Sequence, residues 1–201
     1  MRVDRIIEAA LDQAEEHGVP GVTTASLAHR LEFTEAALYR YFPGKGAILA
    51  AALDYLTERL LATMLLELMP ESAGTFGVEF QLDRHIRRFC LRHGLLLELV
   101  LNAASGREVA LQKSGATFLS RYDAHMTDFF RQVQELDLIG ATIPAGEYAR
   151  LWICQLFGGF VRASLAGDAW DPTTQPGFVA FSAALRRAAD RHDSELDAAR
   201  H

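Results

Sequence analysis

A short stretch around residue 40 gathers side chains that could bind an anion. Tyr39, Arg40 and Tyr41 follow one another, and Lys45 comes about one turn later. Phenolic hydroxyls, a guanidinium and an ammonium can all donate hydrogen bonds to phosphate oxygens, and the N-termini of short helices would add backbone N–H groups. This stretch is a candidate phosphate-binding surface. The alternative is that Tyr39 and Tyr41 are packing residues and Arg40 is a solvated charge.

Two short helices are predicted to position these residues. Thr24 is the expected N-cap of a helix over 25–31, and Thr34 is the expected N-cap of another over 35–41. The second helix is expected to end before Pro43, because the residue preceding a proline is pushed out of the α conformation. Two short helices separated by a turn of about three residues are typical of a helix-turn-helix.

Helical periodicity continues along almost the whole chain, and no run alternates as a strand would. We therefore expect an all-α fold with two domains, a three-helix domain over 1–46 and a larger helical body over 47–201. Gly18 is expected to end the first helix. The predicted helices outside the central pair cover 2–17, 47–69, 79–93, 95–104, 114–138, 145–166 and 175–192.

Residues 6–53 resemble the DNA-binding domain of tetracycline-repressor-like (TetR family) transcriptional regulators, most clearly in the motifs TTASLA (23–28) and LYRYFPGK (38–45). The resemblance implies a helix-turn-helix domain joined to a helical body that binds an effector and dimerises. It also implies a homodimer that binds a palindromic double-stranded DNA operator, usually as a repressor, and leaves it when a small, largely apolar effector binds.

The resemblance also implies roles for individual residues. Thr24 would cap the second helix and touch phosphate, and Tyr39 and Lys45 would grip the DNA backbone. The residues that would face the base edges of the major groove are Glu35, Ala36, Arg40 and Tyr41. The residues expected at the DNA are Thr24, Thr34, Glu35, Ala36, Tyr39, Arg40, Tyr41 and Lys45. The residues expected to form the core between the two helices are Leu27, Ala28, Leu31, Leu38 and Phe42.

Three residues depart from the family pattern. Glu32 stands where the turn usually has a glycine, so the turn is expected to be reshaped. Glu35 replaces a commonly basic or polar residue, and Gly46 replaces a commonly acidic one. A carboxylate at Glu35 could accept a hydrogen bond from cytosine N4, and would then add base selectivity while lowering general affinity. The alternative is that Glu35 only complements the dipole of its helix N-terminus.

The charge balance limits how the chain could bind DNA. The formal net charge of the protein is −6, and the first 50 residues hold five Lys or Arg against seven Asp or Glu. The acidity therefore argues against binding to DNA by bulk charge alone. A dimer that neutralises about five phosphates should have a salt slope of about −4 to −5 in log K. The acidity also motivates an alternative function, a helical dimeric interaction protein of the same fold that has lost specific DNA binding.

The helical body offers candidates for two further sites. An effector cavity is expected to be mostly apolar with a few convergent polar groups. Its candidate residues are His85, Phe89, Tyr122, His125, Met126, Phe129, Trp152 and Gln155. A four-helix dimer interface is expected from the last two helices, with Leu156, Phe160, Phe178, Phe181 and Leu185 as its candidates. Ordinary core packing is the alternative for both sets.

Other features are expected to be absent. No segment suits a secretory signal or a membrane span, so a cytoplasmic protein is expected. Cys90 and Cys154 lie far apart in the sequence and are expected to be free thiols packed in the interior. No nucleophile–base pair, metal-ligand spacing or phosphate loop is present, so we expect no cofactor, no metal and no enzymatic activity.

Overall fold

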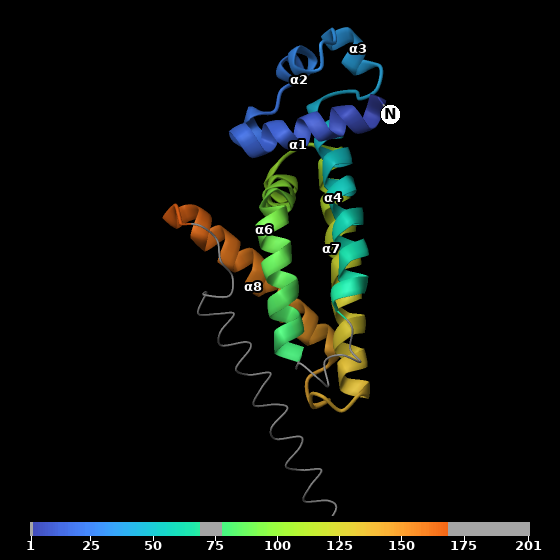
Figure 1. Cartoon of the computed structure of the whole chain (residues 1–201), viewed down its shortest axis with the longest axis vertical. Helices are drawn as coiled ribbons and strands as arrows, with labels where there is room; N and C mark the ends of the chain where they lie inside the picture. Colours follow the sequence, from blue (N-terminus) through green and yellow to red (C-terminus); the bar gives the residue numbers. More distant parts are fainter. Residues whose placement is uncertain (1, 69–77, 169–201) are drawn as a thin grey trace, which may run out of the picture. The chain divides into compact units, whose positions relative to one another are not determined.

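The computed structural model describes residues 2–68 and 78–168, and all regular secondary structure in this part is helical. This confirms the all-α prediction. The helix predicted over 175–192 lies outside the described residues. The helices are α1 (Arg2–Gly21), α2 (Thr24–Arg30), α3 (Glu35–Tyr39), α4 (Lys45–Glu67), α6 (Val78–Ser105), α7 (Val109–Glu135) and α8 (Ala145–Ala166) (Figure 1).

The chain divides into two compact units. Unit 1 contains Met1–Leu60 and His93–Ser120, and unit 2 contains Leu61–Arg92 and Arg121–His201. Unit 1 thus combines α1, α2, α3 and the first part of α4 with the second part of α6, the α6–α7 connection and the first part of α7. The predicted boundary after residue 46 stays a prediction.

The regular helical backbone of α1 is interrupted at Gly18, where the first helix was predicted to end. Gly18 has φ 72° and ψ 165°, and the chain then makes a further turn through Pro20 to Gly21. The predicted end of the first helix at residue 17 is therefore confirmed, and the turn from Val19 to Gly21 follows it as a separate short piece. The face that carries Ile6, Ala10 and Ala14 is buried, as the i, i+3, i+4 periodicity of an amphipathic helix requires.

The body helices differ from the prediction in two places. Helix α7 spans Val109–Glu135 instead of the predicted 114–138, and α6 replaces two predicted helices. Residues 79–93 and 95–104 were expected as two helices, but α6 is continuous through Gly94. A glycine inside a helix costs only about 1 kcal/mol relative to alanine, and burial of apolar side chains exceeds that cost. Leu96, Leu97 and Leu99 directly after the glycine are all fully buried. By contrast, α8 spans the predicted residues 145–166.

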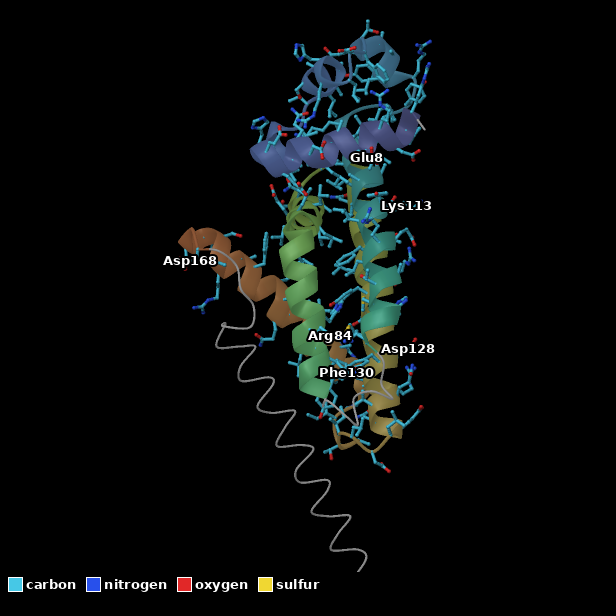
Figure 2. The ribbon with its side chains drawn as sticks, viewed as in Figure 1. Glu8, Arg84, Lys113, Asp128, Phe130 and Asp168 are labelled. Carbon is cyan, nitrogen blue, oxygen red and sulfur yellow. The ribbon has the colours of Figure 1, made fainter. Side chains whose placement is uncertain are left out.

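Each unit has its own apolar core. In unit 1, Ile6, Leu27, Leu38 and Ile48 are at most 1% exposed. In unit 2, one face of α7 lies in the core and the opposite face lies at the surface. Phe130 on the first face is fully buried, whereas Asp128 on the second is exposed (Figure 2). Burying a large aliphatic or aromatic side chain stabilises a fold by roughly 1.5–3 kcal/mol, so these residues fix the helices that carry the candidate sites.

Candidate nucleic-acid interface

The turn between α2 and α3 is a regular helix C-terminal motif. Phe33 N donates to Ala28 O at 2.8 Å, and Glu32 N donates to His29 O at 3.2 Å. This pair of bonds defines a Schellman motif, which requires a left-handed residue after the helix. Glu32 supplies it with φ 57°. The expectation of a reshaped turn is therefore wrong, because the glutamate adopts the conformation that a glycine would prefer.

The N-cap of α2 is Thr23 rather than the expected Thr24. The Thr23 side chain accepts from Ser26 N at 3.1 Å, and the Ser26 hydroxyl accepts from Thr23 N, so the two residues form a capping box. The Thr24 hydroxyl is consequently available for another contact. It donates to Glu35 Oε2 at 2.9 Å and so links the start of α2 to the start of α3.

Helix α3 is anchored on one side and exposed on the other. Thr34 caps it as predicted, accepting from Ala37 N at 3.1 Å. Leu38 is buried, while Tyr39 is 50% exposed; Glu35, Ala36 and Arg40 are exposed as well. Figure 1 shows α2 and α3 on the same side of α1.

Four of the five predicted core residues between these helices are buried. Leu27, Ala28, Leu31 and Leu38 are at most 8% exposed, and Phe42 is half-buried. Because these side chains fix the angle between α2 and α3, the exposed residues of α3 project from a rigid base.

Lys45 lies in a different environment from the one the family resemblance implies. Its Nζ donates to Val19 O and Pro20 O, both at 3.1 Å. Burial lowers the pKa of Lys45, and the carboxylate of Glu108 opposes that shift. The ammonium therefore holds the last turn of α1. A backbone phosphate contact by Lys45 stays a prediction.

Arg2 is a residue of this surface that the sequence did not single out. Its Nη1 donates to the Tyr41 hydroxyl at 3.2 Å, and this hydrogen bond raises the pKa of Arg2. The two residues are 39 positions apart, and no local pattern connects them. A single exposed arginine at the start of a helix gives no signal of such a contact.

In unit 2, three of the predicted effector-site residues form a buried hydrogen-bonded chain. Trp152 Nε1 donates to the Tyr122 hydroxyl at 2.9 Å, and His85 Nε2 lies 3.4 Å from the same oxygen. All three side chains are at most 1% exposed. Because the indole can only donate, the Tyr122 oxygen accepts from it, and which of Tyr122 and His85 donates to the other depends on the imidazole tautomer.

The other predicted effector-site residues lie in varied environments. Met126 and Phe129 are buried, whereas His125 and Gln155 are half-buried. His125 Nδ1 is 2.8 Å from Arg121 O on its own helix. The side chain of Phe89 lies outside the described residues.

Three of the five predicted dimer residues belong to the part of the chain that the structure does not describe. Phe178, Phe181 and Leu185 lie outside the described residues. Leu156 is 2% exposed within its own chain, and Phe160 is half-buried. The exposed apolar stripe of α8 instead contains Leu151, Val161 and Leu165.

Cys154 is exposed on the same helix, so the expectation that it packs in the interior is wrong. The Cys90 side chain lies outside the described residues. Among the described residues, no group of three or more His, Cys, Asp or Glu could hold a metal ion. In residues 2–68 and 78–168, no helix is long and apolar enough to cross a membrane.

The capped α2, the Schellman turn and the exposed α3 define a helix-turn-helix protein whose remaining described part is an all-helical body. Residues 6–52 match the family profile described as bacterial regulatory proteins, tetR family. This segment therefore belongs to the tetR family, and the resemblance predicted from the TTASLA and LYRYFPGK motifs is confirmed.

Individual relatives agree with this assignment. Nucleoid occlusion factor SlmA of Marinobacter nauticus is 26% identical over 132 residues, which cover 65% of this chain and about two thirds (67%) of that protein. The SmeT–triclosan complex superposes with a TM-score of 0.70 at 17% identity over 90% of both chains. A TetR transcription regulator from Haloarcula marismortui gives a TM-score of 0.69 at 18% identity over 94% of this chain and 96% of that one. The chain has the fold of these TetR regulators.

Proposed function

We propose that the chain is a homodimeric, ligand-responsive transcriptional regulator that binds a palindromic operator and represses until a small, largely apolar effector releases it. The observation that carries this proposal is the exposed face of α3. Tyr39 and Arg40 project from a helix whose other side is held by buried Leu38 and by the Thr34 cap. A rigid helix with exposed donors after a tight turn is what major-groove reading requires.

A selection from a pool of random duplex DNA tests the DNA-binding part of the proposal. We expect the purified protein to enrich a palindrome, and the Tyr39→Ala, Arg40→Ala double variant to enrich none. Lys113→Ala is a suitable charge-matched control, since Lys113 is exposed on α7 (Figure 2). If the unaltered protein enriches no sequence at low salt, specific DNA binding is refuted, and the alternative of a dimeric interaction protein takes its place.

The effector-binding part of the proposal is supported by the chain of Trp152, Tyr122 and His85. Met126 and Phe130, one and two turns after Tyr122 on α7, are buried as well. Apolar surroundings with a few converging polar groups are typical of ligand sites. SmeT, which has the same fold, was solved as its triclosan complex.

A thermal-shift screen of small apolar compounds tests this site. A compound present at about 100 times its Kd should stabilise the protein by about 2.7 kcal/mol, which is a readily measured rise in Tm. The same compound should lower operator affinity. A panel that raises no Tm, or a bound compound that leaves operator affinity unchanged, would contradict a ligand-responsive regulator.

Dimerisation is supported by the exposed stripe of α8. Leu151, Val161 and Leu165 lie at helical spacing around the small residue Gly158, and Leu165 is 84% exposed. We expect Leu165→Glu to convert a dimer to a monomer in sedimentation experiments, with Leu136→Glu, an exposed leucine outside α8, as the control.

A further inference from the structure

Two of the five basic residues among the first 50, Arg30 and Lys45, donate hydrogen bonds to other groups of the same unit. Arg30 forms a two-pronged salt bridge with Glu16, at 2.8 and 3.0 Å, and its Nη2 also lies 3.5 Å from Asp12. Lys45 is bound to the two α1 carbonyls described above. Of the five basic residues among the first 50, these two are directed to partners within unit 1. The other three basic residues of this stretch are Arg2, Arg5 and Arg40.

Arg2 is the cation that the structure connects to the recognition helix. Its guanidinium donates to the hydroxyl of Tyr41, which follows the α3 C-cap residue Arg40. Arg2 is exposed and Tyr41 is half-buried, so the contact lies at the surface. The contact engages one N–H group of a guanidinium that carries several more, and the Tyr41 oxygen that accepts it keeps its own proton for a further acceptor.

We propose that Arg2 and Tyr41 form a composite phosphate-binding pair at the end of α3. The Arg2 guanidinium supplies the charge, and the Tyr41 hydroxyl orients it and donates its own proton to the same phosphate group. An arginine held by a neighbouring hydroxyl loses less side-chain freedom on binding than a free one. The pair adds a backbone contact near Lys45, whose ammonium already donates to the Val19 and Pro20 carbonyls. This inference rests on the proposed DNA-binding function.

The salt dependence of binding to a non-specific duplex tests the pair without knowledge of the operator. Affinity for a mixed-sequence duplex of 30 base pairs would be measured by fluorescence anisotropy between 50 and 200 mM KCl. Removing one phosphate contact per protomer should make the slope of log K against log salt less steep by about 1.8 for a dimer. The affinity loss across this range should then be about tenfold smaller for Arg2→Gln than for the unaltered protein.

Two further variants separate this role from general charge effects. Arg5→Gln removes the same charge from an exposed position on the same helix, and its salt slope should equal that of the unaltered protein. Tyr41→Phe should lower affinity severalfold at fixed salt, because the guanidinium loses its orienting partner. The Tm of Arg2→Gln should stay within about 1 °C of the unaltered protein, since an exposed hydrogen bond contributes little to stability.

The possible failures are distinguishable. If the unaltered protein binds the duplex and Arg2→Gln has the same salt slope, the composite pair is refuted while DNA binding stands. An equal change of slope in Arg2→Gln and Arg5→Gln also refutes it, because net charge alone would then explain both. If the unaltered protein does not bind duplex DNA at the lowest salt, the proposed function fails and the role of Arg2 fails with it.

Discussion

Glu108 occupies the space that a side chain on Gly46 would need. A Cβ atom built on Gly46 would lie 2.2 Å from Glu108 Oε2, 2.7 Å from its Cδ and 3.0 Å from its Cβ. Gly46 is the second residue of α4, and Glu108 belongs to the connection between α6 and α7 in the same unit. The family resemblance places an acidic residue at position 46. Here a carboxylate reaches the N-terminus of α4 from another segment, where the helix dipole favours it.

The Gly46–Glu108 relationship predicts non-additive effects on stability. The change in the free energy of unfolding caused by Gly46→Ala should be about 1 kcal/mol more favourable in a Glu108→Ala background than in the unaltered protein. The reason is that the new methyl group must displace the whole carboxylate in one background, whereas in the other it meets only the Cβ atom of residue 108 and gains helix propensity. Urea unfolding of the four proteins measures the coupling. Effects that add to within about 0.3 kcal/mol would show that Glu108 moves aside without loss.

Glu32 is predicted to lower the stability of the turn that it completes. A residue with a Cβ atom in the left-handed region costs roughly 1–2 kcal/mol relative to glycine, and Glu32 has φ 57°. We expect Glu32→Gly to raise the free energy of unfolding by about 1 kcal/mol and Glu32→Ala to leave it nearly unchanged. If alanine stabilises as much as glycine, the cost comes from the carboxylate rather than from the backbone.

Lys45 is predicted to contribute more to stability than an exposed cation of the same surface. Lys45→Met would leave the carbonyls of Val19 and Pro20 without this donor. Hydrogen bonds to charged groups are worth roughly 1.5–3 kcal/mol when buried, and the partial exposure of this one lowers the expected loss to about 1 kcal/mol. Arg40→Met, at an exposed position, is the control and should change Tm very little. Equal Tm values for the two variants would contradict the role of Lys45 in holding α1.

The sequence predicts the recognition surface well because its signals are local. Thr34 as an N-cap and Leu38 as a buried residue follow from spacing within a few residues. The ends of α8 are predicted for the same reason, since a proline precedes it and Gly167 closes it with φ 72°. Capping and turn chemistry act over one helical turn, so a pattern of single residues is enough to find them.

Contacts between distant segments account for what the sequence did not predict. The Arg2–Tyr41 hydrogen bond, the Glu108 carboxylate over Gly46 and the Lys45 contact with α1 each join residues at least 25 positions apart. Side chains of these types are ordinary at exposed positions. Only the packing of helices from different parts of the chain decides which of them meet.

Tyr122 is predicted to be a stability determinant as well as an effector-site residue. Tyr122→Phe removes the oxygen that accepts from Trp152 Nε1 and leaves that buried donor without it. An unsatisfied buried donor costs roughly 1–3 kcal/mol, and we expect a loss in this range from chemical denaturation. Tyr55→Phe is the matched control, because the Tyr55 hydroxyl accepts only from exposed Arg59 in the described contacts. A Tyr122→Phe protein as stable as Tyr55→Phe would indicate that Trp152 finds another acceptor.

Glu35 is predicted to contact a base edge, and its hydrogen bond with Thr24 determines which carboxylate oxygen can make that contact. The Thr24 hydroxyl occupies Oε2, so Oε1 is the oxygen available to accept from cytosine N4. Glu35→Gln keeps the shape of the side chain but adds a donor and removes the charge. We expect the selected half-site to lose a cytosine preference at one position, while affinity for mixed-sequence DNA rises because the carboxylate no longer repels phosphate. Selection with both proteins measures the change. If the preferences are the same at every position, Glu35 serves only the N-terminus of α3, and Thr24→Val should then change stability without changing the selected sequence.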